Sequence, residues 1–86
     1  MASYDVRLSN KAQKALESLE LKLATRIIAA LEILATNPMP RNSNKLHGSE
    51  NTHRLRIGDC RVIYEIRSSV LIIFVIRIGH RRDTYR

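Results

Sequence analysis

One stretch decides the fold: His53-Arg54-Leu55-Arg56-Ile57-Gly58-Asp59-Cys60-Arg61-Val62-Ile63-Tyr64-Glu65-Ile66-Arg67. Apolar and polar residues alternate on both sides of Gly58-Asp59, which is the pattern of two half-buried strands joined by a tight turn. After a second turn at Ser68-Ser69, the seven consecutive apolar residues from Val70 to Ile76 predict a strand buried on both faces. We therefore expect a three-stranded antiparallel meander over residues 53–78.

The residues before this meander predict one more strand and a helical region. Residues 4–8 alternate in polarity, and Ser9 is a suitable N-cap for a helix. Apolar residues then recur every three to four positions over 10–19 and 23–35, up to a stop at Asn37-Pro38. The pattern weakens near residues 18–21, so a helical hairpin is favoured and one continuous helix also fits. Residues 39–52 indicate an irregular connection, apart from Leu46.

These elements predict an α+β fold for one domain spanning residues 1–86. The N-terminal strand joins the meander in a single sheet, and the helical hairpin covers one face of it. A length of 86 residues with 44% hydrophobic residues is enough for one core. The lone Cys60, the lack of a secretory leader and the lack of an apolar run near about 18 residues favour a cytoplasmic protein without a membrane span.

Positive charge is concentrated in the second half of the chain. The formal net charge is +7, and residues 53–86 hold eight arginines and no lysine against three acidic residues. A basic domain favours a polyanionic partner, although charge can also serve solubility alone. Arginine without lysine suits phosphate in particular, because the guanidinium fork contacts two phosphate oxygens at once.

Strand alternation predicts where these arginines lie. Arg54 and Arg56 are two residues apart and should share one sheet face, and Arg61 on the adjoining strand could join them. The face of Arg61 also includes Glu65 and Arg67. Such a set predicts a phosphate site, while a solvated sheet face is an equally good interpretation from spacing alone.

The final ten residues, Arg77-Ile78-Gly79-His80-Arg81-Arg82-Asp83-Thr84-Tyr85-Arg86, favour the phosphate site. Gly79 would let the backbone leave the sheet and place the next three residues at its rim. Fixed cations and two groups able to exchange a proton, His80 and Tyr85, suit phosphoryl transfer. A metal site is not expected, because His47, His53 and His80 lack ligand spacing. Cys60 is predicted to be a packing residue.

In these residues the chain resembles the RelE toxins of bacterial toxin–antitoxin systems. The resemblance rests on Lys45-Leu46-His47-Gly48, on Arg54 to Ile66, and on Arg77 to Tyr85. The sequence Arg61-Val62-Ile63-Tyr64-Glu65-Ile66 is typical of the whole RelE/ParE superfamily. The Gly-His-Arg-Arg-Asp-x-Tyr ending is typical of the ribosome-dependent endonucleases rather than of ParE, which poisons gyrase.

The resemblance implies a toxin that cuts mRNA in the ribosomal A site, through attack of a ribose 2′-hydroxyl on the adjacent phosphate, without a metal or cofactor. Carried over by position, Arg61 matches the phosphate-binding arginine, Arg81 the arginine that stabilises the transition state, and Tyr85 the catalytic tyrosine. Arg54 and Arg56 match strand positions that are commonly lysine. His80 lies where lysine and histidine alternate in the family. Arg56, Arg61, His80, Arg81 and Tyr85 are thus the expected catalytic residues, with further RNA contacts from Arg54, Arg67, Arg77 and Arg82.

The arginine at position 56 changes one implied role. A guanidinium does not readily release its proton, so Arg56 can hold charge but is a poor general base. Tyr85 is the preferred base and His80 the other candidate, with His80 or Arg81 protonating the leaving oxygen.

The resemblance also implies partners. They are a RelB-like antitoxin that wraps the toxin, the 70S ribosome with its mRNA, and operator DNA bound by the toxin–antitoxin complex. Since the sequence ends at Arg86, without the extra C-terminal helix of some members, the antitoxin is expected to cover the sheet and the basic site directly. Two other functions stay open, namely a ParE-like inhibitor of gyrase and a non-catalytic basic RNA-binding module.

Overall fold

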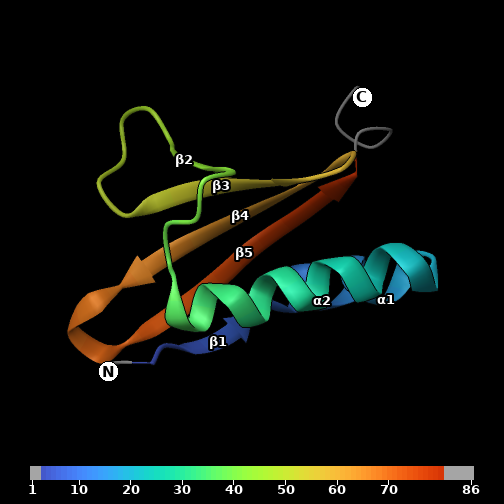
Figure 1. Ribbon diagram of the computed structural model, residues 1–86, viewed down its shortest axis with the longest axis horizontal. Helices are drawn as coiled ribbons and strands as arrows, with labels where there is room; N and C mark the ends of the chain where they lie inside the picture. The colour runs from blue at the N-terminus through green and yellow to red at the C-terminus, as the bar shows by residue number, and fades with distance from the viewer. Residues whose placement is uncertain (1–2, 81–86) are drawn as a thin grey trace.

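The computed structural model describes residues 3–80. Its elements are β1 (Asp5–Leu8), α1 (Asn10–Ser18), α2 (Leu21–Thr36), β2 (Ser43–Lys45), β3 (Thr52–Ile57), β4 (Cys60–Arg67), a short 3-10 turn (Ser68–Val70) and β5 (Ile72–His80). The five strands form one sheet in the order β1-β5-β4-β3-β2. Both helices pack on the same side of the sheet and leave the other side open (Figure 1). The predicted α+β class is confirmed.

The helical region is a hairpin rather than one helix. Ser9 caps α1 as predicted, its side-chain oxygen accepting a hydrogen bond from the backbone N–H of Ala12 at 3.0 Å. The chain turns at Leu19 and Glu20, both of which have extended backbone conformations. Helix α2 then ends at Thr36, as Pro38 requires.

The meander forms as predicted, and the first strand joins it in parallel. β1 pairs with β5 over Asp5 to Leu8, while β3, β4 and β5 pair antiparallel. One strand is additional, because Ser43–Lys45 pairs with β3 at the far edge of the sheet. Its three residues carry no alternation of polarity, so the pattern that predicts strands cannot detect it.

The third strand of the meander begins later than expected. Val70 and Leu71 belong to the turn and are exposed, and Leu71 has a left-handed backbone conformation at φ 54°. Within β5, Tyr64 pairs with Val75 whereas Ile63 pairs with Arg77, so Ile76 is an extra residue that forms a β-bulge. Ile76 is 36% exposed, and the expectation that the whole run from Val70 to Ile76 is buried is wrong.

The core lies between the helices and the inner face of the sheet. Its largest fully buried side chain is Tyr64, whose hydroxyl donates to the backbone oxygen of Pro38 at 2.7 Å. The ring of His53 stacks on Tyr64 with centroids 5.5 Å apart. Cys60, at the start of β4, is also buried, as predicted for a packing residue. This packing fixes the inner face, and strand alternation then fixes which side chains point outward.

Candidate functional site

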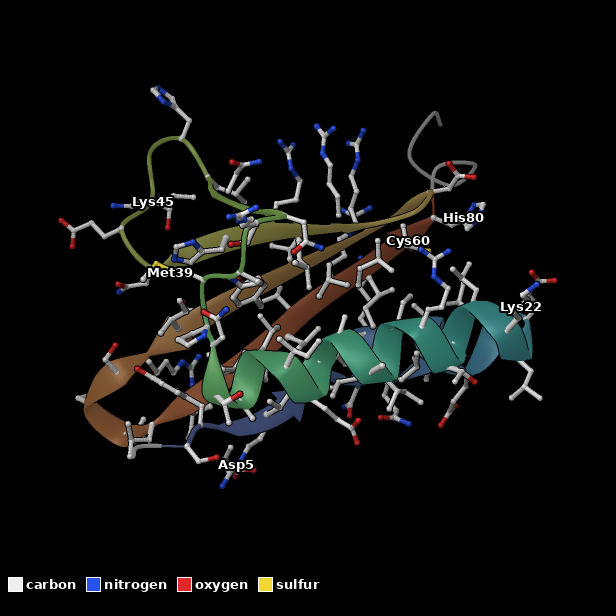
Figure 2. All side chains as sticks on the ribbon, in the orientation of Figure 1. Asp5, Lys22, Met39, Lys45, Cys60 and His80 are labelled. Carbon is white, nitrogen blue, oxygen red and sulfur yellow. The ribbon has the colours of Figure 1, made fainter. Side chains whose placement is uncertain are left out.

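Arginines gather on the sheet face that the helices leave open. Arg56 and Arg61 lie directly opposite each other on β3 and β4, and Arg54 lies opposite Ile63. Leu55, Ile57 and Val62 alternate with these residues and are buried on the inner face. Figure 2 shows side chains ending in nitrogen that rise from this open face. The strand register therefore places Arg54, Arg56 and Arg61 on one face, as predicted.

The bulge adds a fourth arginine. Without an extra residue, Arg77 would lie on the same face as Ile73 and Val75, which are fully buried. The insertion at Ile76 changes the alternation, so that Arg77 pairs with Ile63 and points outward with its neighbours. The apolar run that precedes Arg77 gives no signal for this change.

A hollow of about 190 Å³ lies among these side chains. It is lined by three arginines, two aliphatic residues and a glycine, namely Arg54, Arg61, Arg77, Leu46, Ile63 and Gly79. Gly79 lies opposite Arg61 and contributes no side chain, which keeps that side of the hollow open. Sequence reasoning did not identify Leu46 or Ile63 as part of a site, because single aliphatic residues in a strand or connection are usually core.

Two positive charges face each other on this side of the sheet, which is unfavourable for folding. Like charges directly opposite each other destabilise an antiparallel sheet, and Arg56 faces Arg61 in this way. Arg7 and Arg67, by contrast, have carboxylate partners in Asp5 and Glu65. Within residues 3–80, no ion pair joins these central arginines to a carboxylate, so the face is suited to bind an anion.

Arg67 does not join this cluster. It lies six residues along β4 from Arg61, about 20 Å at the rise of an extended strand. Its Nε donates to the carboxylate of Glu65, and its guanidinium carbon lies 4.9 Å from the ring centre of Phe74. The structure thus brings Arg54, Arg56, Arg61 and Arg77 together and leaves Arg67 at the opposite end of the sheet.

The remaining predicted residues lie at or beyond the end of β5. The strand continues through Gly79 to His80, so the predicted exit from the sheet at Gly79 is wrong. His80 pairs with the buried Cys60, and alternation puts it on the helix side of the sheet, near the β3–β4 turn (Figure 2). Arg81, Arg82 and Tyr85 fall outside the described residues.

Metal-ligating side chains and the character of the helices can be described for residues 3–80. Among residues 3–80, no three side chains of His, Cys, Asp or Glu gather closely enough to hold a metal ion. Over the same residues, neither helix has the length and apolar character that crossing a membrane requires.

Comparisons with known proteins agree on one superfamily. Residues 6–85 match the profile described as the ParE toxin of the type II toxin–antitoxin system parDE. The toxin RelE1 of Methanocaldococcus jannaschii is 29% identical, with 96% of each chain covered.

Solved structures give the same result. RelE in the crystal structure of the RelE–RelB complex from Pyrococcus horikoshii superposes with a TM-score of 0.83 at 31% identity, covering 92% of this chain and 96% of that one. RelBE2 from Mycobacterium tuberculosis gives a TM-score of 0.81 at 24% identity, with 93% and 100% covered, and so supports the fold alone. The protein therefore belongs to the RelE toxins of the RelE/ParE superfamily, which are the toxins of type II toxin–antitoxin systems.

Proposed function

We propose that this toxin is an endoribonuclease that cuts mRNA in the ribosomal A site. The observation that carries the proposal is the group of four arginines, Arg54, Arg56, Arg61 and Arg77, on the open face of three adjoining strands. Guanidinium groups contact phosphate oxygens in pairs and stabilise negative charge that develops on them. Strands of a packed sheet fix the backbone positions from which these cations project, and preorganised cations favour stabilisation of a transition state.

The proposed reaction is an internal transfer. A ribose 2′-oxygen attacks the adjacent phosphorus, the bond from phosphorus to the 5′-oxygen breaks, and the products are a 2′,3′-cyclic phosphate and a 5′-hydroxyl. A base takes the proton from the 2′-hydroxyl, and an acid gives one to the 5′-oxygen. Arg56 and Arg61 hold the charge of the phosphate, and because these cations supply the electrostatic stabilisation, we propose that no metal takes part.

Tyr85 is the proposed general base, and Arg81 the proposed partner of the leaving oxygen. Nearby arginines favour the ionised form of a tyrosine, whereas a guanidinium cannot act as a base at neutral pH. His80 is the second candidate for either proton transfer, and its register position on the helix side of β5 makes it the less favoured of the two.

Induction in bacteria followed by primer extension tests the proposal. Wild-type protein should stop growth and produce cuts at fixed codon positions in translated messages only. Arg61→Ala removes a fixed cation and Tyr85→Phe removes the proposed base. Each variant should therefore produce at least a hundredfold less cleaved mRNA than wild type. Arg7→Ala is the matched control, since Arg7 is an exposed arginine on β1 that pairs with Asp5, outside the cluster. Cuts that persist in both site variants would overturn the assignment.

Gyrase inhibition is the second candidate, and the match to the ParE profile is the observation that favours it. In that case, induction should produce double-strand DNA breaks and an SOS response without cuts in mRNA. A non-catalytic RNA-binding module would bind ribosomes or RNA and produce neither outcome.

We also propose that a RelB-like antitoxin wraps this toxin in the cytoplasm and covers the arginine face. RelE from Pyrococcus horikoshii was crystallised with RelB, and that likeness supports the proposal. An antitoxin with an acidic segment would neutralise the cluster, and the resulting complex would bind operator DNA. A small acidic reading frame that overlaps this gene, and co-purification of its product with the toxin, are the expected findings.

A further inference from the structure

The backbone of Arg56 is held by Asn42, a residue outside the arginine cluster. Asn42 comes directly before β2, and the register that pairs Ser43 with Leu55 continues to it, so Asn42 lies opposite Arg56. The N–H of Arg56 donates to the backbone oxygen of Asn42 at 3.2 Å, and the side-chain Nδ2 of Asn42 donates to the backbone oxygen of Arg56 at 2.9 Å. Asn42 therefore binds both backbone polar groups of Arg56.

The side chain of Asn42 takes the place of a strand hydrogen bond. In an antiparallel sheet, the two residues of a hydrogen-bonded pair exchange both bonds through their backbone groups. Here one of the two comes from the Asn42 amide, because β2 itself begins only at Ser43. A turn fixes Asn42 in turn, since the backbone oxygen of Pro40 accepts from the N–H of Ser43 at 3.0 Å and from its hydroxyl at 2.7 Å. The contact between the β2 segment and β3 thus extends to the residue that carries a central cation.

These hydrogen bonds oppose the repulsion between the two central cations. A strand residue directs its N–H and its C=O toward the same neighbouring strand, so Arg56 directs both toward Asn42 and away from β4. Its pair with Arg61 is therefore of the non-hydrogen-bonded kind, in which the side chains come closer together. Like charges in such a pair repel each other. Arg56 is held against this repulsion from the β2 side.

We propose that Asn42 is a positioning residue for the phosphate site. It keeps the backbone of Arg56 at the place from which its guanidinium, together with that of Arg61, meets one phosphate. Asn42 acts through Arg56 and takes no part in the proton transfers. An aspartate of the same shape cannot replace it, because a carboxylate has no proton to donate to a carbonyl oxygen. This inference rests on the proposed function, since it assigns the support of one phosphate-binding residue.

Cleavage of mRNA on translating ribosomes by purified variants tests the inference. Asn42→Ala removes the donor to the Arg56 carbonyl and should lower kcat about tenfold with KM within about twofold of wild type, because one cation is misplaced while the rest of the surface still binds. Asn42→Asp keeps the shape without the donor and should lose at least as much activity. Asn44→Ala, which removes an exposed asparagine of β2 opposite Arg54, is the matched control and should cleave as wild type does.

A second substitution separates positioning from folding. In protein that carries Arg56→Ala, adding Asn42→Ala should lower kcat by less than about twofold, because the cation that Asn42 positions is already gone. Alanine at position 56 keeps the backbone oxygen, so the fall in melting temperature caused by Asn42→Ala should be the same in both backgrounds. A residue that only stabilises the fold would change kcat by the same factor in both.

Binding of inorganic phosphate tests the same contact without ribosomes. In an NMR titration of wild type, the side-chain N–H signals of Arg56 and Arg61 should shift together. Asn42→Ala should raise the phosphate concentration at half-saturation by about threefold or more, because the two guanidinium groups no longer meet at one anion. Asn44→Ala should leave this concentration unchanged.

Two outcomes would overturn the inference. One is an Asn42→Ala variant that cleaves mRNA and binds phosphate as wild type does, and the other is an equal loss of kcat with and without Arg56. Failure of the proposed function looks different. If no mRNA is cut, or if Arg56→Ala cuts as wild type does, the cleavage site is assigned wrongly, and phosphate binding by Asn42→Ala still decides whether Asn42 positions Arg56.

Discussion

At the scale of single residues, the pair Arg56 and Arg61 should lower the stability of the sheet, although we propose that it is needed to bind phosphate. The two cations face each other directly across β3 and β4, in a position where like charges cost a sheet about 0.2–1 kcal/mol. Arg56→Thr should therefore raise the free energy of unfolding by up to about 1 kcal/mol, because threonine also suits a strand. Urea denaturation at low salt measures this gain, while mRNA cleavage by the same variant should fall.

High salt provides the control for this prediction. Screening shortens the range of charge repulsion, so the gain from Arg56→Thr should shrink as the salt concentration rises to 1 M. A variant that is less stable than wild type at low salt would contradict the view that the pair is kept for binding.

His53 gives the fold a dependence on pH. Burial lowers the pKa of His53 from its ordinary value of 6.5, and the positive charge of Lys45 lowers it further. As the pH falls, the unfolded chain therefore takes up a proton on His53 before the folded chain does. The contribution of His53 to stability is complete above about pH 6.5 and is lost as the pH falls through the lowered pKa. The groups that face the ring are Lys45 on β2 and Tyr64 on β4.

Unfolding curves between pH 5 and 8 measure this dependence. His53→Phe keeps a ring to stack on Tyr64 and cannot titrate, so the difference in stability between wild type and this variant should change only below about pH 6.5. His47→Ala, which removes an exposed histidine, should retain the wild-type profile. A constant difference across the whole range would contradict the assignment to His53.

Residue positions on a face were largely predictable, because alternation in β3 and β4 places Arg54, Arg56 and Arg61 on one side once the core residues are known. Arg77 was expected to contact RNA, but nothing in its apolar surroundings indicates the bulge that turns it outward. Leu46 and Ile63 could not be recognised, since their role depends on the arginines that surround them in three dimensions.

At the scale of elements, Ser9 connects the first helix to the bulge. Its hydroxyl donates to the backbone oxygen of Ile76 at 2.7 Å and accepts from the N–H of Ala12, while its own N–H donates to Val75. Ser9→Ala removes the cap and leaves the bulge carbonyl without its partner, so it should lower the free energy of unfolding by about 1–2 kcal/mol.

Ser18→Ala is the matched control, because Ser18 lies at the exposed end of α1 and its hydroxyl donates to the backbone oxygen of Ala15 in the same helix. Thermal unfolding should place Ser9→Ala roughly 4–8 °C below wild type for each kcal/mol lost, and Ser18→Ala close to wild type. Equal effects from the two substitutions would mean that the contact with Ile76 does not stabilise the bulge.

Elements with regular periodicity were predicted well, and elements defined by pairing were not. Helix α2 and strands β3 and β4 have clear patterns over many residues, so their existence and type follow from the sequence. Strand β2 is only three residues long and exists because β3 offers it an edge. The parallel direction of β1 likewise depends on which edge of the meander is free, which periodicity does not report.

At the scale of the whole molecule, the arginine face predicts how RNA binding responds to salt. Four phosphate contacts from Arg54, Arg56, Arg61 and Arg77 contribute about −3 to the slope of log K against log salt concentration, at roughly 0.7 per contact for a single strand. Fluorescence anisotropy with a labelled single-stranded RNA measures it. Arg77→Ala should reduce the slope by about 0.7 and Arg67→Ala should leave it unchanged. A flat response in wild type would rule out phosphate contact by this face.

The place of β5 in the sheet has a consequence for synthesis. It is the last described strand to leave a translating ribosome, and yet it lies inside the sheet between β1 and β4. Until it emerges, β1 has no strand to pair with, Arg77 is absent from the open face, and Ser9 has no bulge to hold. The arginine face, which we propose to be the site of RNA cleavage, is therefore completed only after β5 has emerged.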